Sequence, residues 1–468
     1  MAFIEKIIST TNDALYSYIL IILLVLGGIY FTVRTRFAQF RLLGQQFKAV
    51  TEKTDGKGVS SFQALMVSTA SRVGTGNIIG VATAICMGGF GSVFWMWVIA
   101  IIGAASAFVE STLAQIYKKR GSDGCYGGPA HYIEAVTKRK WLAMVFSVFL
   151  ILTYGVGFNM LASYNLQSTF SSYEFYNAQY TPWIIGFIVA AITAYCLIGG
   201  GKRIVSVTSF LVPIMGAAYI LVAIVISLIN FKMLPDIFKQ IFAGAFDFKA
   251  IFGGFGGSCV MYGIKRGLFS NEAGVGSAPN ASASAEISHP AKQGLVQVLS
   301  VFIDTILVCS ATAFMCMTSG VTPPADSSLA AAYVQEALGA TLGGIGPIFI
   351  TVAMMLFAFT TLLGNLYYVD KAINYIMGKE PSRAFRNVCY VIASLVIFAG
   401  AGLSADLLWG MADIMMGGMT LINMPIIIYF GKYAIRALKD YEKKVKNGEE
   451  VTFKASDIDL PDKTDYWN

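Results

Sequence analysis

Long apolar stretches alternate along the chain with short polar connections, a pattern that is typical of helices crossing a membrane. A helix needs about 20 predominantly apolar residues to cross the hydrocarbon core of a bilayer. The pattern therefore predicts an all-α polytopic membrane protein. It predicts eleven spanning segments, at residues 14–33, 62–86, 91–117, 141–169, 182–200, 204–229, 250–269, 293–319, 343–377, 385–402 and 405–436.

The second segment is interrupted at its centre by a polar run that contains Arg72, Gly74, Thr75, Gly76 and Asn77. A charge and freed backbone groups are costly at bilayer depth, so such a break is tolerated where it lines a cavity. The two helix ends would offer bare N–H groups, which suit a carboxylate, and bare carbonyls, which suit a small cation. The alternative is a glycine-mediated helix contact, and the two glycines alone do not decide between these interpretations.

A second glycine-rich run, at residues 252–263, contains five glycines in twelve residues. When the first segment is set aside as an accessory helix, each broken segment opens a group of five. Paired broken segments at matching positions indicate inverted repeats that share a site near the bilayer midplane. The predicted organisation is a single transporter domain at 1–436, with the accessory helix at 14–33, repeat one at 62–229 and repeat two at 250–436, then a polar cytoplasmic tail at 437–468.

Composition limits the possible functions. Hydrophobic residues make up 56% and charged residues 13% of the 468-residue chain, as expected for a protein embedded in a bilayer. The two histidines, His131 and His289, lie in polar connections, and the seven cysteines show no close pairs of metal-site spacing. We therefore expect a protein that is not an enzyme, with a lipid bilayer around it, no nucleic-acid partner and no obligatory protein partner.

The lysines and arginines predict the orientation. With the connection between the first two segments placed inside, 29 of the 34 Lys and Arg residues fall on the inner side and four on the outer side, while Arg72 lies within a segment. The inner count includes Lys265 and Arg266, taken as part of a connection. Because an excess of positive residues marks the cytoplasmic side, we expect a cell-membrane protein with its N-terminus outside and its C-terminus cytoplasmic.

The residues around the two breaks resemble the alanine or glycine:cation symporters of the amino acid–polyamine–organocation superfamily, which have a LeuT-type fold. The resemblance covers about residues 14–436, and its most specific part is the run Ser270–Gly274 followed by Gly276–Pro279. It rests in full on Val73–Ile78, Phe94–Trp97, Gly127–Ala130, Phe269–Gly274, Gly276–Pro279 and Leu356–Thr361. It implies a five-plus-five inverted repeat with one additional N-terminal helix.

The resemblance also implies a function, the uptake of a small neutral amino acid, alanine or glycine, with sodium by alternating access. The substrate site that it implies is formed by both breaks, at Thr75, Gly76, Asn77, Gly256, Gly257, Ser258 and Tyr262. By position, it implies a site for the co-transported sodium ion at the carbonyls of Ala70, Val73 and Phe357 and the hydroxyls of Thr360 and Thr361. The alternative for the two threonines is a hydrogen bond back to their own helix.

Two positions depart from the family pattern and widen the choice of substrate and ion. Ala162 stands where the family usually has Gln, and Asn365 stands where it often has Trp. A larger amino acid such as glutamine, or coupling to protons, is the alternative within the same fold. A passive channel or facilitator is the alternative from another class, but it would need a continuous polar lining, whereas this chain shows two local breaks.

Charged residues near the breaks lead to a further expectation. Arg72 can pair with Asp304 or Glu110, as a gate or as a static charge-neutralising pair, because charges inside a membrane usually pair. Asp304 could also carry the proton in the proton-coupled alternative. Asn271 and Glu272 can either cap the loop that follows them or form an inner gate, and the sequence does not separate these roles.

Overall fold

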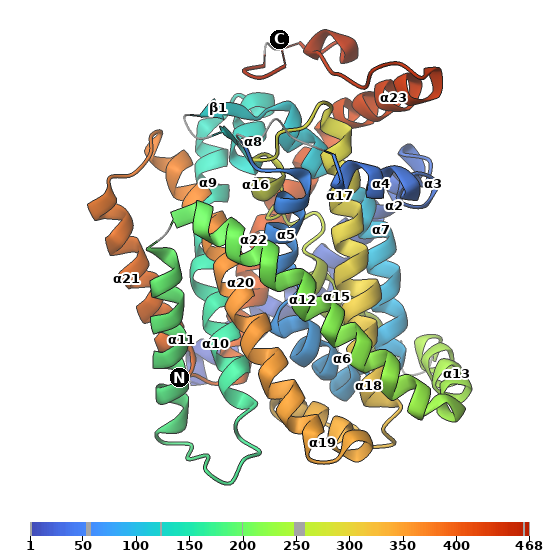
Figure 1. Cartoon of the computed structure of the whole chain (residues 1–468), viewed down its shortest axis with the longest axis vertical. Helices are drawn as coiled ribbons and strands as arrows, with labels where there is room; N and C mark the ends of the chain where they lie inside the picture. The colour runs from blue at the N-terminus through green and yellow to red at the C-terminus, as the bar shows by residue number, and fades with distance from the viewer. Residues whose placement is uncertain are drawn as a thin grey trace.

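The computed structural model describes residues 2–52, 58–121, 124–198, 200–247, 258–461 and 464–467. Nearly all regular structure within these residues is helical, in agreement with the predicted class (Figure 1). The exceptions in this part of the chain are a short antiparallel hairpin of β1 (Lys119–Gly121) and β2 (Gly124–Tyr126), and a single bridge between Val59 and Ala285.

The first half of the chain contains the accessory helices and those of the first predicted repeat. They are α1 (Ala2–Ala14), α2 (Leu20–Arg34), α3 (Ala38–Arg41), α4 (Leu43–Val50), α5 (Ser61–Arg72), η2 (Gly76–Gly80), α6 (Val81–Gly88), α7 (Gly91–Ile116), α8 (Pro129–Thr137), α9 (Lys140–Leu150), η3 (Ile151–Gly157), α10 (Phe158–Ser168), α11 (Thr181–Leu197), α12 (Gly200–Ile229) and α13 (Leu234–Ala245).

The second half contains the helices of the second predicted repeat and the tail. They are α15 (Cys259–Asn271), α16 (Pro279–Ser282), α17 (Pro290–Val301), η6 (Phe302–Cys309), α18 (Ser310–Met317), α19 (Ala330–Leu342), α20 (Ile345–Met377), α21 (Arg383–Gly400), α22 (Ala405–Phe430) and α23 (Lys432–Asn447).

Several of these helices are long and apolar enough to cross a membrane. Among the described residues there are seven such stretches, at Gly91–Ile116, Lys140–Ser168, Gly200–Ile229, Pro290–Met317, Ile345–Met377, Arg383–Gly400 and Ala405–Phe430. Shorter apolar helices at Leu20–Arg34, Gly76–Gly88 and Thr181–Leu197 coincide with further predicted segments. The chain is therefore a multi-pass membrane protein, while the total of eleven spans and the five-plus-five repeat stay predictions.

Helix α7 lies at the centre of the packing, with extensive contacts to α15 and α17. Glycines make the contact with α15 close: a Cβ at Gly267 would lie 2.5 Å from Cγ2 of Ile99, and a Cβ at Gly263 would collide with the carbonyl of Ser92. Small residues let helix backbones approach each other in a membrane, where dispersion and shape hold helices together. Gly263, part of the predicted second break, therefore serves a helix contact.

The two ends of the chain lie at different ends of the molecule. The C-terminus, α23 and the β1–β2 hairpin lie together at the top of Figure 1, and the N-terminus lies away from them in the lower half of the view. An odd number of membrane crossings gives this arrangement. Which end faces the cytoplasm stays a prediction.

The polar tail predicted at 437–468 is only partly solvated. Helix α23 carries the chain to Asn447, and the side chain of Trp467 is buried farther on. Nε1 of Trp467 donates to the carbonyl of Gln115 near the end of α7, at 2.7 Å. A large aromatic ring gains more by burying its apolar surface than by staying in water, so the end of the tail packs against the transporter body.

Candidate functional site

Helix α5 ends at Arg72, where the sequence predicts the first break, and the helical path resumes at Gly76. In a continuous helix the amide of Gly74 would bond to the carbonyl of Ala70. It donates instead to Oδ1 of Asn77 at 2.7 Å, so the Ala70 carbonyl loses this helical donor. The first break is therefore a local unwinding that the side chain of Asn77 stabilises.

Both glycines of the break allow other helices to approach it closely. A Cβ at Gly74 would collide with Oγ1 of Thr361 on α20, and a Cβ at Gly76 would lie 2.7 Å from Cε1 of Phe269 on α15. The glycine-mediated helix contact that the sequence left open is therefore present. It places α20 and α15 directly against the unwound turn.

The second discontinuity of the described chain follows α15. This helix runs uninterrupted from Cys259 to Asn271, and Oγ of its N-cap Ser258 accepts from the amide of Met261. The chain then leaves the helix at Glu272 and Gly274, whose φ angles of 53° and 84° lie in the left-handed region. Left-handed residues terminate helices, and glycine adopts this conformation without steric cost.

The structure tests only the last part, residues 258–263, of the predicted break at residues 252–263, and finds no break there. The part of that run up to and including Gly256 and Gly257 lies outside the described residues, and the rest caps or belongs to α15. The physical reason is that Gly263 packs α15 against α7 and does not unwind the helix. The run Ser270–Gly274, in which the sequence predicted a cap or a gate at Asn271 and Glu272, contains the turn that ends α15.

Tyr262, predicted to bind substrate, lies far from the first break. A Cβ at Gly88 would be 3.0 Å from Cβ of Tyr262, so this tyrosine lies beside the end of α6. Gly88 comes twelve residues after Gly76, which is about 18 Å along a helix that rises 1.5 Å per residue. Tyr262, and Ser258 one turn before it, are therefore not brought to the first break.

Lys265 and Arg266 do not lie in a cytoplasmic connection, as the orientation count assumed. Both are buried within α15, and both contact Oδ2 of Asp413, through Nζ at 3.0 Å and Nη2 at 3.1 Å. Lys265 also donates to Oδ1 of Asn12 on α1, so this ion cluster joins α15 to α1 and α22. Without the two residues the predicted inner side still holds 27 of the 34 Lys and Arg, and the predicted orientation is unchanged.

Asn77 joins the first break to α15 and to η6. Its Nδ2 donates to Oδ1 of Asp304 at 2.6 Å and to Oγ of Ser270 at 3.0 Å, and its own carbonyl accepts from Oγ1 of Thr312 at 2.7 Å. Asp304 also accepts from the hydroxyls of Ser270 and Thr305, each at 2.7 Å. The side chain of Asn77, predicted to bind substrate, is therefore engaged within the protein as a bridge between elements.

Arg72 forms neither of the ion pairs predicted with Asp304 or Glu110. It is buried, and its Nη1 donates to Oε1 of Gln297 at 2.9 Å, while Nε and Nη2 have no hydrogen-bond partner among the described residues. The Glu110 carboxylate accepts instead from the amide of Gly274 at 3.3 Å. Neutral groups on neighbouring elements thus take the place of the expected charge partners.

The two threonines predicted as sodium ligands differ in their hydrogen bonds. Oγ1 of Thr360 bonds back to the carbonyls of Leu356 at 3.0 Å and Phe357 at 3.2 Å, so Thr360 fits the helix-bonding alternative. Oγ1 of Thr361 is buried, faces Gly74 and has no partner in the described part of the chain. A buried hydroxyl without a partner costs about 1–3 kcal/mol, so Thr361 points to a ligand that completes its coordination.

Two asparagines of α10 bring further polar atoms to the break. Nδ2 of Asn165 donates to Oγ1 of Thr75 at 3.1 Å, and Oδ1 of Asn159 accepts from Nδ2 of Asn365 at 3.0 Å. The other amide atoms, Oδ1 of Asn165 and Nδ2 of Asn159, are buried without a partner among the described residues. The predicted site did not include them, although asparagines inside a spanning segment are a signal of function.

Asn271 and Glu272 have separate roles. Oδ1 of Asn271 accepts from the amide of Ala273 at 3.0 Å, which caps the turn after α15. The buried carboxylate of Glu272 accepts from Oγ of Ser277 at 2.6 Å and from Oγ of Ser71 at 3.4 Å. Capping therefore describes Asn271, and Glu272 links the second turn to the end of α5.

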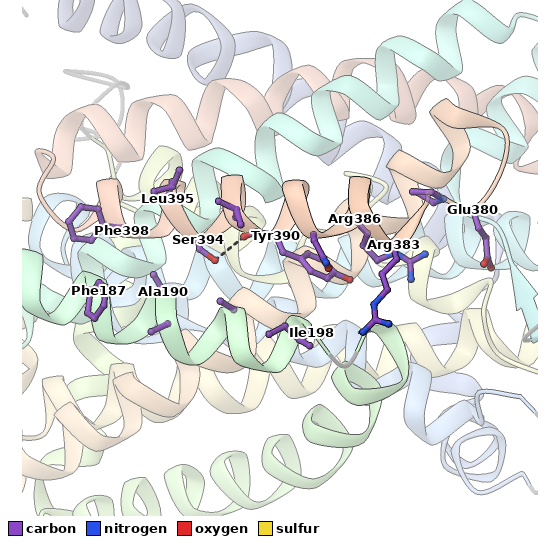
Figure 2. A pocket seen from close by; sticks show the side chains of 16 residues that line it. Phe187, Ala190, Ile198, Glu380, Arg383, Arg386, Tyr390, Ser394, Leu395 and Phe398 are labelled. Carbon is purple, nitrogen blue, oxygen red and sulfur yellow. Dashed lines mark hydrogen bonds between the residues drawn. The ribbon is translucent and has the colours of Figure 1, made fainter.

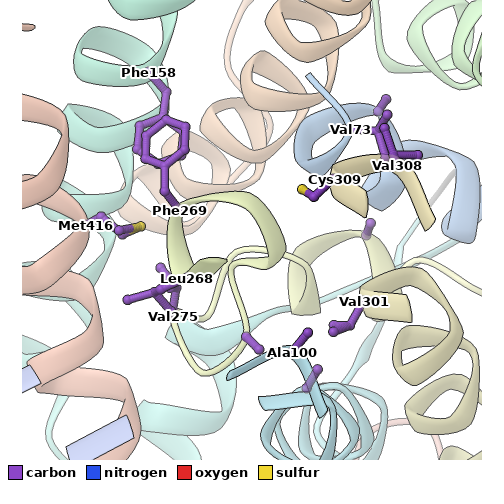
Figure 3. Packing of buried hydrophobic residues seen from close by; sticks show 14 of the residues in the cluster. Val73, Ala100, Phe158, Leu268, Phe269, Val275, Val301, Val308, Cys309 and Met416 are labelled. Atoms are coloured by element: carbon purple, nitrogen blue, oxygen red, sulfur yellow. The ribbon is translucent and has the colours of Figure 1, made fainter. Parts of the chain in front are cut away.

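An aromatic layer covers Gly76. The ring of Phe269 lies 4.5 Å from that of Phe158, between centroids, and the two rings overlap in Figure 3. Phe269 also lies 4.8 Å from the ring of Trp409, over which the guanidinium of Arg266 sits at 4.0 Å. This layer restricts the space beside the first break to small groups.

Comparison with known proteins adds independent information. A family model described as the sodium:alanine symporter family matches residues 1–455. The amino-acid carrier protein AlsT of Bacillus subtilis is 41% identical over 458 residues, which cover 98% of this chain and 96% of the relative. The probable sodium/glutamine symporter GlnT of the same species is 40% identical, over 96% of this chain and 93% of the relative. The sodium/alanine symporter AgcS of Methanococcus maripaludis is 35% identical, over 94% of this chain and 98% of the relative.

Proposed function

The chain belongs to the sodium:alanine symporter family, and on that premise we propose that it imports alanine or glycine together with sodium by alternating access. Sodium-coupled amino acid transport, and not an enzymatic reaction, follows from the family. The observation that carries the finer proposal is the hydroxyl of Thr361 against Gly74, which has no hydrogen-bond partner among the described residues. It lies at an unwound turn beside which Asn159 and Asn165 also present polar atoms that are unpaired within the described part of the chain.

The sodium ion would bind between the unwound turn and α20. Its proposed ligands are neutral oxygens, namely the carbonyls of Ala70, Val73 and Phe357 and the hydroxyls of Thr361 and Thr360. Hard cations prefer such oxygen ligands, and the Ala70 carbonyl has lost its helical donor to Asn77. Thr361 is the most informative of these ligands because its hydroxyl makes no competing hydrogen bond in the described structure.

The substrate carboxylate would bind at the start of the half-helix that begins at Gly76. The start of a helix, with the positive end of its dipole, favours an anion there. Thr75 is held at this point by Asn165, and the ring of Phe269 leaves room for only a small side chain. Asn159 and Asn165 join the proposed site in place of Ser258 and Tyr262, which lie away from the first break.

The proposal includes the LeuT-type architecture with eleven spans. The accessory helix at 14–33 would precede inverted repeats at 62–229 and 250–436, with the N-terminus outside and the C-terminus cytoplasmic. Its support is that the two discontinuities adjoin each other, because Asn77 of the first donates to Ser270 beside the second at 3.0 Å. Paired broken helices around one central site have this relation.

Glutamine is the second candidate substrate. The relative GlnT is named a probable sodium/glutamine symporter, and the buried Ala162 is smaller than the glutamine expected at its position. A smaller wall residue leaves more volume for a longer substrate side chain. The same sodium site would serve either substrate.

A panel of labelled amino acids in proteoliposomes tests the proposal. With an inward sodium gradient, we expect alanine and glycine to accumulate above their external concentration, which a passive facilitator cannot achieve. Glutamine accumulation in excess of both would favour the second candidate. No accumulation of any neutral amino acid above protein-free vesicles would overturn the proposed function.

A further inference from the structure

A groove of about 940 Å³ lies between α11 and α21, on the outside of the transporter body (Figure 2). Apolar side chains from both helices line it, among them Phe187, Ala190 and Ala194 on α11 and Val391, Leu395 and Phe398 on α21. Several are well exposed, with 66% of Phe187 and 61% of Leu395 accessible. In a membrane-spanning protein such a face is turned towards lipid.

The groove is a wedge that is closed at one end. A Cβ at Gly186 would lie 2.7 Å from Cβ of Ala401 and 3.1 Å from the carbonyl of Phe398, so the two helices touch there. At the other end the groove lining includes Ile198 and Arg383. Figure 2 shows Phe187 and Phe398 at the closed end and Arg383, Arg386 and Glu380 at the open end. A wedge of this shape admits a flexible apolar chain along the helix direction.

The open end carries positive charge. Arg383 is exposed and makes no hydrogen bond or ion pair to any described residue. Arg386, one turn farther along α21, lies 3.7 Å from Oδ1 of Asp370, and its Nε makes no hydrogen bond within the described residues. Glu380 also lines this end. The first turn of α21 adds the positive end of a helix dipole, so the mouth of the wedge favours an anion.

We propose that this wedge binds one anionic phospholipid of the surrounding membrane. An acyl chain lies between α11 and α21, and the phosphate contacts Arg383 and Arg386. The open end lies on the same side of the molecule as the β1–β2 hairpin and α23 (Figure 1), the side expected to be cytoplasmic. The cytoplasmic leaflet contains anionic lipids, and basic pockets between spanning helices on that side bind their headgroups. The inference does not depend on which amino acid is transported.

Lipid retention by the purified protein tests this site directly. Delipidated protein in detergent is mixed with equal amounts of phosphatidylglycerol and phosphatidylcholine of matched chains, and bound lipid is counted by native mass spectrometry. We expect phosphatidylglycerol to be retained in preference. Each basic group near a membrane surface is worth about 1 kcal/mol, or about five-fold in binding, so Arg383→Ala should reduce the preference about five-fold.

Control variants distinguish effects on headgroup binding from effects on acyl-chain binding and on folding. Arg34→Ala removes an exposed arginine at the corresponding end of α2 and should leave retention unchanged. Ala194→Trp fills the wedge and should reduce retention of both lipids, whereas Ile192→Trp, on α11 outside the groove lining, should not. Glycerophosphoglycerol, which lacks acyl chains, should not compete at the concentration of the lipid. A cooperative thermal unfolding transition would show that each variant is folded.

Three outcomes would overturn the proposal. Equal retention of the two lipids by the parent protein would remove the anionic preference. Unchanged retention in both Arg383→Ala and Ala194→Trp would place any bound lipid elsewhere. A dimer that forms in detergent and is lost in Ala194→Trp would show that a second copy of the chain, and not lipid, occupies the wedge.

Discussion

Thr360 and Thr361 are neighbours on α20 with different hydrogen-bond states, and this difference makes a residue-scale test possible. The hydroxyl of Thr360 is engaged by its own helix, whereas that of Thr361 faces the first break without a partner in the described structure. Loss of a hydroxyl that coordinates the sodium ion should weaken ion binding. A hydroxyl that only bonds to its helix should not.

We predict that Thr361→Ala raises the sodium concentration for half-maximal uptake roughly 5- to 30-fold, as the loss of about 1–2 kcal/mol requires. Thr361→Ser keeps the hydroxyl and should stay near the parent protein. Thr360→Ala should have the smaller effect of the two alanine variants. Amino acid uptake is measured as a function of sodium concentration for the parent protein and the three variants. An unchanged sodium concentration for half-maximal uptake in Thr361→Ala would remove this residue from the sodium site.

Gly76 is the second residue-scale test, because the proposed carboxylate position depends on the absence of its side chain. We predict that Gly76→Val abolishes uptake. The variant should still insert into the membrane and show a thermal unfolding transition, as a folded protein does. Alanine should compete with labelled substrate, and alaninamide and ethylamine should not, because they lack the carboxylate. The branched side chain fills the approach to the backbone amides.

The contact between Gly76 and Phe269 requires a control, since a Cβ would lie 2.7 Å from that ring. Phe269→Ala makes room for the added side chain. If Gly76→Val/Phe269→Ala transports as well as Phe269→Ala alone, the glycine serves packing only. Competition by alaninamide equal to that by alanine would likewise show that the carboxylate is not held here.

His131 on α8 gives a pH-dependent prediction outside the spanning segments. Burial, with the nearby positive charges of Lys119 and Lys371, lowers the pKa of His131 to about 4. An unfolded histidine titrates near pH 6.5, so below that pH the unfolded chain binds the proton more readily than the folded one. The stabilising effect of the neutral ring is present above about pH 6.5 and is lost as the pH falls towards 4.

We predict that His131→Phe makes thermal stability less dependent on pH. The ring of His131 packs edge-on against Tyr126 and Tyr375, so phenylalanine fits among them. Between pH 7.5 and pH 5 the parent protein should lose at most about 2 kcal/mol more than the variant. Unfolding curves at the two pH values measure the difference, and equal losses would mean that His131 does not control the acid response.

At the scale of elements, the contact of α15 with α7 depends on small residues. We predict that Gly263→Ala destabilises the protein by about 1–3 kcal/mol, as overpacking typically does, because its Cβ would meet the rigid backbone carbonyl of Ser92. Gly216→Ala on α12 is the matched control, since no atom lies within 4 Å of its added Cβ. Thermal unfolding in detergent compares them, and equal stability of the two variants would contradict the packing role.

The same element shows what the sequence could and could not predict. Hydropathy placed the apolar segments well, and the polar run between Arg72 and Asn77 located the first break because charge and glycine coincide there. Within the run 252–263, glycine content did not show that Gly263 packs α15 against α7, since a glycine at a helix contact and a glycine at an unwound turn look alike in sequence. The turn at Glu272 and Gly274 is recognised only from the backbone.

Side-chain partners were harder to predict than elements. Arg72 and Asp304 both lie deep in apolar segments, which suggested a pair, but Arg72 bonds to Gln297 and Asp304 bonds to Asn77 instead. Asn159 and Asn165 were missed because their importance depends on which atoms remain unpaired after folding. Such choices depend on the three-dimensional neighbours of each group, which hydropathy does not encode.

At the scale of the whole molecule, the account joins the first break, α10, α15 and α20 around one sodium-coupled site, while the wedge between α11 and α21 lies outside it. Coupling to sodium is the central claim, because the proposed ion ligands are neutral oxygens. The proton-coupled alternative would instead use a carboxyl group such as Asp304. That side chain accepts hydrogen bonds from Asn77, Ser270 and Thr305.

The most direct test measures labelled alanine uptake in proteoliposomes under one gradient at a time. The account predicts accumulation with an inward sodium gradient at equal pH on both sides, and uptake at the level of protein-free vesicles with an inward proton gradient in sodium-free buffer. Asp304→Asn should retain the sodium dependence even if the rate falls. Accumulation driven equally well by the proton gradient without sodium would contradict the account.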